Sequence, residues 1–257
     1  MPDVTRQQIV DGIRALGVQP GDCLLVHSLL SSFGHVTGGA VAVAEALVDS
    51  VGPGGDAFVP TFTYGQSPFS PTTTPSMDGA ITEAFRTLPD AKRSAHPTHS
   101  LAGIGPNVPE VLVRHEMTTP FGLASPLWRL WERNAWVLLI GCDQTANSMV
   151  HVAEERERMA YLDRRRRAQV HAPDGTIQEV EVRRPGCSAA FQVIDPALRA
   201  RNAIREGKVG LATLSLMRSR DIVDVLITML RGNPEVLLCG RAECTACAQA
   251  LAMLRAD

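Results

Sequence analysis

The sequence lacks any apolar run long enough to cross a membrane. No stretch approaches the roughly 18 consecutive apolar residues that a spanning helix needs. The first residues, "MPDVTRQQIVDGIRALG", contain no apolar core of a signal peptide and are typical of an amphipathic helix. The net charge is only −2, so the overall balance favours neither nucleic acid nor a membrane surface as a partner. We therefore expect a cytoplasmic protein that binds neither of them.

Cysteine is scarce as well. The chain has six cysteines in 257 residues, and only Cys239, Cys244 and Cys247 lie close together, in "CGRAECTAC". A zinc site needs a fourth ligand, and no second CxxC or HxxxH motif lies near this segment. We therefore expect no metal, and we interpret these thiols as small, buried or partly buried side chains.

Several common enzyme signatures are also missing. The sequence has no GxGxxG after a strand and no GxxxxGK[ST], which disfavours the usual nucleotide-binding loops. It has no GxSxG, which disfavours an α/β-hydrolase. HExxH is absent too, because "MTT" follows His115–Glu116.

What is present is an alternation of helix and strand patterns. Helical spacing of apolar residues covers six segments, namely 4–16, 40–51, 80–88, 108–116, 125–134 and 148–163. Short apolar runs predict strands at 22–30, 57–64, 136–141 and 235–240, and the remaining C-terminal residues are interpreted as helices. No linker or repeat divides the chain, so we expect one α/β domain over residues 1–257, with a central mixed sheet flanked by helices.

Residues 169–185 interrupt this alternation. Their period-two pattern around Asp174–Gly175 predicts an antiparallel β-hairpin appendage. The preceding run, Arg164–Arg167, fits the solvated C-terminal end of a helix, where the helix dipole favours cations. A contact with a phosphate or a partner is the alternative.

Two polar loops could hold a ligand. In "VHSLLSSFG" (26–34), three serines and a glycine precede a helix, which suits phosphate or amide groups but equally a polar loop with capping residues. In "KRSAHPTHSLAGIG" (92–105), Arg93, His96 and His99 cluster around a proline, which suits an anionic ligand or a loop held by its own hydrogen bonds.

A third feature is "NSMVHVAEE" (147–155), directly after the strand pattern at 136–141. On a helix, His151 and Glu154 lie on one side, so the carboxylate can orient the imidazole and stabilise its charged form. The position just past the carboxyl end of a strand is where open α/β sheets bind ligands. Taken alone, the same spacing is also typical of a solvated surface pair.

Together, these motifs resemble the aminoglycoside 3-N-acetyltransferase family, also called the antibiotic N-acetyltransferases. The matching text is "VHSLLSSFGHVTGGAVAVAEAL", "VGPGGDAFVPTFTY", "GAITEAFRTLPDAKRSAHPTHSLAGIGPNV", "FGLASPLWRLWE" and "VLLIGCDQTANSMVHVAE", in the order of the family. The resemblance covers residues 10–155 closely and the rest loosely. It implies an acetyl-coenzyme A-dependent enzyme whose α/β fold is distinct from that of the GCN5-related acetyltransferases.

The resemblance also implies roles for residues. The expected coenzyme A contacts are Ser28, Leu30, Ser31, Ser32, Phe33, Gly34, Arg93, Ser94 and Ser100. His151 matches the catalytic histidine of the family and Glu154 its accompanying carboxylate. Leu29 stands where the family usually has another serine, so one hydrogen bond to the cofactor is expected to be missing.

An amine acceptor must lose a proton before it attacks a thioester, and His151 is the expected general base of a direct transfer. An aminoglycoside is a polycation and favours acidic and polar groups; the expected substrate contacts are Tyr64, Asp78, Asp143, Asn147 and Glu155. The alternatives are acylation of another amine in a biosynthetic pathway and a catalytically silent coenzyme A-binding protein. A homodimer is left open.

Overall fold

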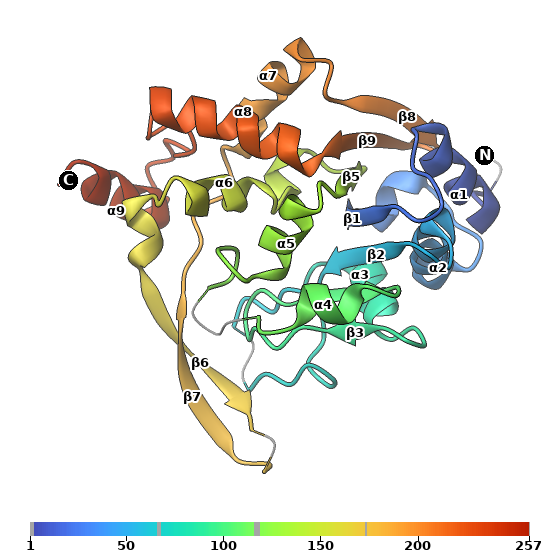
Figure 1. The fold of residues 1–257 in the computed structure, drawn as a ribbon, viewed down its shortest axis with the longest axis horizontal. Helices are drawn as coiled ribbons and strands as arrows, with labels where there is room; N and C mark the ends of the chain where they lie inside the picture. The colour runs from blue at the N-terminus through green and yellow to red at the C-terminus, as the bar shows by residue number, and fades with distance from the viewer. Residues whose placement is uncertain (1–2, 66–67, 116–118, 173, 257) are drawn as a thin grey trace.

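The computed structural model describes residues 3–65, 68–115, 119–172 and 174–256. Its centre is a seven-stranded sheet with the order β3-β4-β2-β1-β5-β9-β8 (Figure 1). The strands are β1 (Cys23–Ser28), β2 (Asp56–Pro60), β3 (Lys92–Arg93), β4 (Leu101–Ile104), β5 (Trp136–Ile140), β8 (Arg205–Val209) and β9 (Ala212–Arg218). β1 runs parallel to β2 and β5, whereas β4 and β9 pair antiparallel with β2 and β5. The expected mixed sheet is confirmed.

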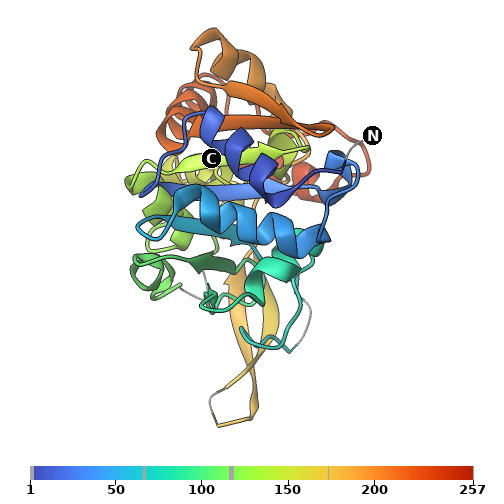
Figure 2. The same ribbon diagram turned by 90° about the vertical axis from the view of Figure 1, so that its right-hand side faces the viewer.

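Helices cover both faces of this sheet. One face carries α1 (Arg6–Ala15), α2 (Gly39–Val51) and α3 (Ala80–Arg86), which Figure 2 shows in front of the strands. The other face carries α4 (Val108–Leu112), α5 (Pro126–Glu132), α6 (Val150–Arg156) and α8 (Ser219–Gly232). The remaining helices are α7 (Asp195–Ala200) and α9 (Thr245–Leu254). In the part of the chain that the structure describes, no helix is long and apolar enough to span a membrane.

The two faces of the sheet explain why the central strands are apolar throughout. Successive side chains of a strand point to opposite faces. Leu24 and Val26 therefore pack with α1 and α2, whereas Leu25 packs in the core beneath α5 and α6. β5 is buried at every position, as expected for a strand with helices on both sides.

The predicted hairpin forms, and it extends away from the body of the molecule (Figure 1). Its strands are β6 (Arg165–His171) and β7 (Ile177–Arg183), joined by a turn in which Asp174 accepts hydrogen bonds from Thr176. Pro173 lies outside the described residues. The expected solvated helix end at Arg164–Arg167 is wrong, because three of these four arginines belong to β6.

The long predicted helix over 148–163 is also wrong. Its helical part ends at Arg156, and the chain turns through Arg158, whose φ of +52° is left-handed. A short 3-10 helix, η3 (Ala160–Asp163), then begins. The chain therefore reverses its direction after only two helical turns of α6.

The C-terminal third departs from the prediction in two further ways. Residues 235–240 form turns and irregular backbone instead of a strand, and Leu237 is buried in the core beside α8. Residues 205–218 form the β8–β9 hairpin where helices were expected. β8 is an edge strand with mostly exposed, polar side chains, so its sequence carries little strand signal.

Candidate active site

A large concave site lies at the carboxyl ends of the parallel strands β1, β2 and β5. It is a cavity of about 670 Å³, lined by the residues that follow these strands, by the loop before α3, and by residues 185–191. β1 is followed by a crossover to β2 on one side and has β5 on its other side. Open α/β sheets bind ligands at such a point because two loops diverge there.

His151 and Glu154 form a hydrogen-bonded pair in this cavity. His151 Nδ1 lies 2.5 Å from Glu154 Oε2, and the exposed fractions of the two side chains are 8% and 1%. An ionised carboxylate only accepts hydrogen bonds, so it fixes the hydrogen on Nδ1. Nε2 is then the ring nitrogen with a lone pair. His151 lines the cavity, whereas Glu154 lies behind it.

The Glu154 carboxylate also accepts a hydrogen bond from a second side chain. The Tyr161 hydroxyl, from η3, donates to Glu154 Oε1 at 2.6 Å. Burial, followed by the charge of Glu154, raises the pKa of Tyr161, so its hydroxyl stays protonated and can only donate here. Glu154 therefore uses one oxygen for the imidazole and the other for Tyr161.

Aromatic rings clamp the imidazole. Phe121 stacks on His151 with a centroid distance of 4.6 Å and an interplanar angle of 3°. Phe191 meets the same ring edge-on at 4.9 Å and 70°. Both phenylalanines line the cavity and are buried. The orientation of His151 is thus fixed by packing as well as by its hydrogen bond.

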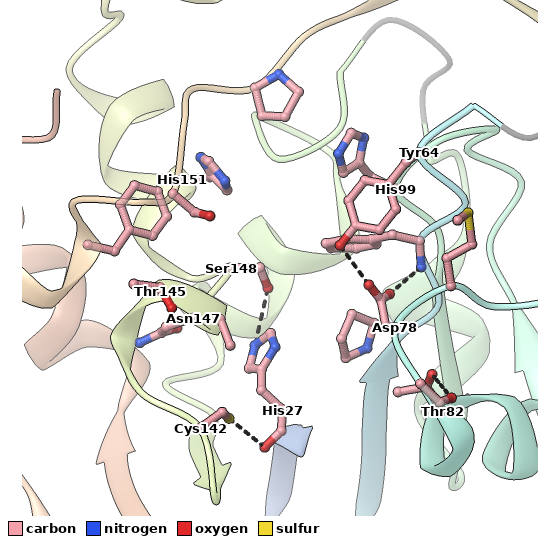
Figure 3. Close-up of a pocket in the computed structure, with 18 of the residues that line it drawn as sticks. His27, Tyr64, Asp78, Thr82, His99, Cys142, Thr145, Asn147, Ser148 and His151 are labelled. Carbon is pink, nitrogen blue, oxygen red and sulfur yellow. Dashed lines mark hydrogen bonds between the residues drawn. The ribbon is translucent and has the colours of Figure 1, made fainter. Parts of the chain in front are cut away.

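The opposite wall carries the negative charge. Figure 3 shows Tyr64 and Asp78 across the cavity from His151. Asp78 accepts hydrogen bonds from the Tyr64 hydroxyl at 2.8 Å and from the Phe62 backbone N–H at 2.5 Å. Burial raises the pKa of Asp78 to about 6, against the opposing effect of these hydrogen bonds. Among the described lining residues, Asp78 is the only carboxylate, and none is a lysine or arginine.

The floor of the cavity is formed where β1 ends. His27 Nε2 lies 3.3 Å from Ser148 Oγ, and burial lowers the pKa of His27 to about 4, so the ring is neutral near pH 7. Ser28 Oγ is buried beside it and has no hydrogen-bond partner among the described residues. Asn147, fully buried, accepts from the Met149 backbone N–H and shapes the entry to α6.

Comparison with known proteins identifies the family. The family model described as aminoglycoside 3-N-acetyltransferase matches residues 25–231. The chain belongs to this family. It is 32% identical to aminoglycoside N(3)-acetyltransferase IV of Salmonella over 237 residues, covering 91% of this chain and 90% of that protein. It is also 32% identical to the aminoglycoside N(3')-acetyltransferase-like protein YokD of Bacillus subtilis (strain 168), covering 86% and 90%.

Solved structures of aminoglycoside acetyltransferases share the fold. Apo AAC(3)-IVa superimposes with a TM-score of 0.90 at 32% identity, covering 98% of each chain. A histidine-to-alanine mutant of that enzyme, in complex with a gentamicin, gives 0.88 at 31% identity and covers 97% and 98%. AAC-IIIb with CoASH gives 0.81 at 24% identity, which supports the fold alone, and covers 90% and 97%. The predicted family and fold class are therefore confirmed.

The expected coenzyme A contacts fall into two groups, those of the loop after β1 and those formed by Arg93, Ser94 and Ser100. The loop after β1 forms a short 3-10 helix, η1 (Leu30–Phe33), beside the cavity, with Ser31 and Gly34 exposed. Ser28 and the exposed Leu29 line the cavity itself. Ser32 donates to the Leu29 carbonyl, and the Phe33 ring is buried in the core. The loop can still present its backbone and its exposed serine to a ligand.

Arg93, Ser94 and Ser100 do not line the cavity. The Arg93 guanidinium donates to Thr61 and Ser100, and also to the Thr74 carbonyl, so it ties the strand ends to the long loop. Burial lowers its pKa to about 10, which leaves it charged. Ser94 Oγ bonds His115 Nδ1 at 2.8 Å. In this structure these three side chains support the wall of the site from within the protein, and their contact with coenzyme A stays a prediction.

Two of the five expected substrate contacts also lie elsewhere. Asp143 is exposed and caps η2 (Gln144–Ala146) by accepting from the Thr145 backbone N–H. Glu155 lines a separate depression, where its Oε2 lies 3.5 Å from Arg183 Nη1. Helical geometry explains the second case, because residues one apart point in directions about 100° apart. Tyr64, Asp78 and Asn147 do line the cavity with His151.

Sequence reasoning missed several lining or supporting side chains. His27 ends a buried strand, which is the one signal that could have found it. Phe121 begins the family motif "FGLASPLWRLWE" but was given no role, Phe191 belongs to none of the quoted motifs, and Tyr161 was placed on the predicted helix over 148–163. His99 was noted, and its ring lies 5.0 Å from that of Phe121.

Proposed function

We propose that this chain transfers the acetyl group of acetyl-coenzyme A to an amino group of an aminoglycoside, namely the 3-amino group of 2-deoxystreptamine. The observation that carries the proposal is the buried His151–Glu154 pair, with His151 lining a cavity whose only described carboxylate is Asp78. The relatives named N(3)-acetyltransferases support the choice of reaction and acceptor.

His151 acts as the general base. Its Nε2 accepts the proton that the acceptor amine must lose, while the amine nitrogen attacks the thioester carbonyl carbon. The carbon–sulfur bond then breaks, and the proton passes to the leaving thiolate of coenzyme A. No acyl-enzyme forms. The histidine-to-alanine mutant of AAC(3)-IVa holds a gentamicin, which supports a histidine that acts on a bound aminoglycoside in that relative.

Glu154 positions this base. It holds the Nδ1 hydrogen and stabilises the imidazolium that forms when Nε2 is protonated. Both of its oxygens already accept hydrogen bonds, and its side chain is buried behind His151 and does not line the cavity, so Glu154 does not face the acceptor amine. The carboxylate therefore acts through His151.

Coenzyme A fits the loop over residues 28–34. Ser28 Oγ, which has no hydrogen-bond partner among the described residues, offers a hydroxyl at the cavity, and Ser31 offers an exposed one on the adjoining η1, along which the pantetheine and pyrophosphate would lie. The thioester oxygen, which becomes negative in the transition state, needs a hydrogen-bond donor, and this loop offers backbone N–H groups and hydroxyls for that role. The matched family is described as N-acetyltransferases, and that reaction needs an activated acetyl donor such as acetyl-coenzyme A.

Asp78 attracts the acceptor. An aminoglycoside carries several ammonium groups, and one carboxylate facing His151 across the cavity can bind a second ammonium while the first reacts. Tyr64 holds Asp78 in this direction through its hydroxyl.

The test is thiol release from acetyl-coenzyme A in the presence of 2-deoxystreptamine aminoglycosides, for wild type and His151→Ala. We expect turnover by the wild type and a loss of about 10²–10⁴-fold in the variant, with acetyl-coenzyme A binding retained. Full kcat in His151→Ala would exclude it as the base. Activity on other amines, with none on any aminoglycoside, would instead support acylation in a biosynthetic pathway.

A further inference from the structure

Four cysteines from two distant segments meet at one point. Cys187 lies in the loop after β7, Cys239 in the connection between α8 and α9, and Cys244 and Cys247 at the start of α9. Their four sulfur atoms all lie within 4.8 Å of one another. The sequence alone hid this cluster, because Cys187 precedes Cys239 by more than 50 residues.

The arrangement matches the dimensions of a tetrahedral zinc site. A zinc–sulfur bond of about 2.3 Å places tetrahedral thiolates roughly 3.8 Å apart. Cys244 Sγ lies 3.8 Å from Cys187 Sγ. None of the four is disulfide-bonded, and a single disulfide would leave the other two thiols of the cluster without a reason to converge.

Two of these sulfurs already accept hydrogen bonds from backbone N–H groups. The Cys239 N–H donates to Cys247 Sγ at 3.3 Å, and the Ala189 N–H donates to Cys187 Sγ at 3.5 Å. Such N–H···S hydrogen bonds stabilise thiolates and orient them around a metal.

We propose that Cys187, Cys239, Cys244 and Cys247 bind one structural Zn²⁺ ion. All four tetrahedral positions are filled by protein sulfur, so no open position is left for a substrate. The site therefore stabilises the structure and takes no part in the chemistry of the cavity.

The metal would fasten the C-terminal segment to the active-site wall. Pro185 and Gly186, next to Cys187, line the cavity. Gly186 lies so close to Glu154 that a Cβ there would sit 2.5 Å from Glu154 Oε1. Arg164 runs alongside, donating to the carbonyls of Pro185 and Ala246. Zinc binding would thus hold α9 against the loop that backs the catalytic pair.

The primary test is the metal content of the protein purified without added zinc or chelator, by inductively coupled plasma mass spectrometry. We expect about one zinc per chain. Removal of the metal by a mercurial reagent should lower the Tm, and added zinc should restore it. Co²⁺ bound to the metal-free protein should give the visible and near-ultraviolet bands of tetrahedral thiolate coordination.

Variants locate the site. Cys187→Ser should lose the zinc, whereas Cys23→Ala, a cysteine of β1 outside the cluster, should keep it. Zinc in the wild type that persists undiminished in Cys187→Ser would overturn the four-cysteine site. No zinc in the wild type, with no Co²⁺ spectrum, would overturn the proposal altogether. If Cys187→Ser fails to fold, the wild-type metal content and Co²⁺ spectrum still decide.

A thiol count tests for a disulfide in place of the metal. Four reactive thiols, in place of all six, in denatured, unreduced protein would indicate a disulfide and would overturn the four-cysteine zinc site.

Discussion

Glu154 is bonded to His151 through one oxygen and to Tyr161 through the other, and its side chain is 1% exposed. The three-residue spacing alone is compatible with a contact of this carboxylate to the imidazole, to the substrate amine or to both. The structure shows the contact with the imidazole and leaves neither oxygen facing the cavity. Each member of this chain of three groups can be changed separately.

The Glu154→Gln variant should lower kcat by about 10²–10⁴-fold, because an amide neither stabilises the imidazolium nor enforces the hydrogen on Nδ1. KM for acetyl-coenzyme A should stay the same. Steady-state kinetics with an aminoglycoside acceptor would check this. Glu157→Gln is the control at the end of the same helix, where the carboxylate pairs with Arg231 outside the cavity. Equal kcat for wild type and Glu154→Gln would remove Glu154 from the mechanism.

The Tyr161→Phe variant should lower the free energy of unfolding by about 1–3 kcal/mol, since a buried carboxylate loses a donor. Chemical denaturation would measure the loss. Tyr64→Phe is the comparison, because its side chain is half exposed and its hydroxyl bonds a carboxylate at the cavity surface. A loss no larger in Tyr161→Phe than in Tyr64→Phe would contradict the assignment.

Asp78 predicts a pH dependence of acceptor binding. Its pKa of about 6 means that the carboxylate is charged above pH 6 and neutral below it. KM for the aminoglycoside should therefore fall as the pH rises through about 6. Asp78→Asn should raise KM at neutral pH and flatten this dependence, with KM for acetyl-coenzyme A as the internal control. If the pH profile of KM for Asp78→Asn is identical to that of the wild type, Asp78 does not bind the acceptor.

Gly186→Ala tests the contact behind the catalytic pair. A methyl group there would meet Glu154 Oε1 at 2.5 Å, so Glu154 or the loop must move, and kcat should fall. Gly232→Ala is the control, because a Cβ at that helical position meets nothing within 4 Å. Comparing kcat with Tm for both variants separates a displaced carboxylate from general loss of stability. Unchanged kcat in Gly186→Ala would mean that the loop yields without disturbing the pair.

Local patterns predicted the parts of this protein that depend on neighbours in sequence. Ser125 is an example: a serine directly before Pro126 at the start of a helical pattern predicts an N-cap, and its hydroxyl accepts from the Trp128 backbone N–H. The His151–Glu154 pair, three residues apart on one helix, is another. In both cases the spacing along the chain already fixes the geometry.

Contacts between distant or turned segments could not be predicted in this way. A straight helix would carry Tyr161 roughly 10 Å along its axis from Glu154, and the left-handed turn at Arg158 brings it back. Arg93 carries a charge that suggested an anionic ligand, yet carbonyls and hydroxyls of the protein itself use its donors. Cys187 meets its partners only through the tertiary contact between the loop after β7 and the C-terminal segment.

The stacking of Phe121 on His151 has a consequence for the path of the proton. A half-turn of the imidazole would break the bond to Glu154, and the ring is held by Phe121 on one face and by Phe191 at its edge. His151 therefore cannot accept a proton at one ring nitrogen, rotate, and release the proton at the same point in the cavity from the other nitrogen. If Nε2 accepts the proton of the amine, Nε2 must also release it. The return of His151 to its neutral form therefore depends on which molecule occupies the cavity after acetyl transfer.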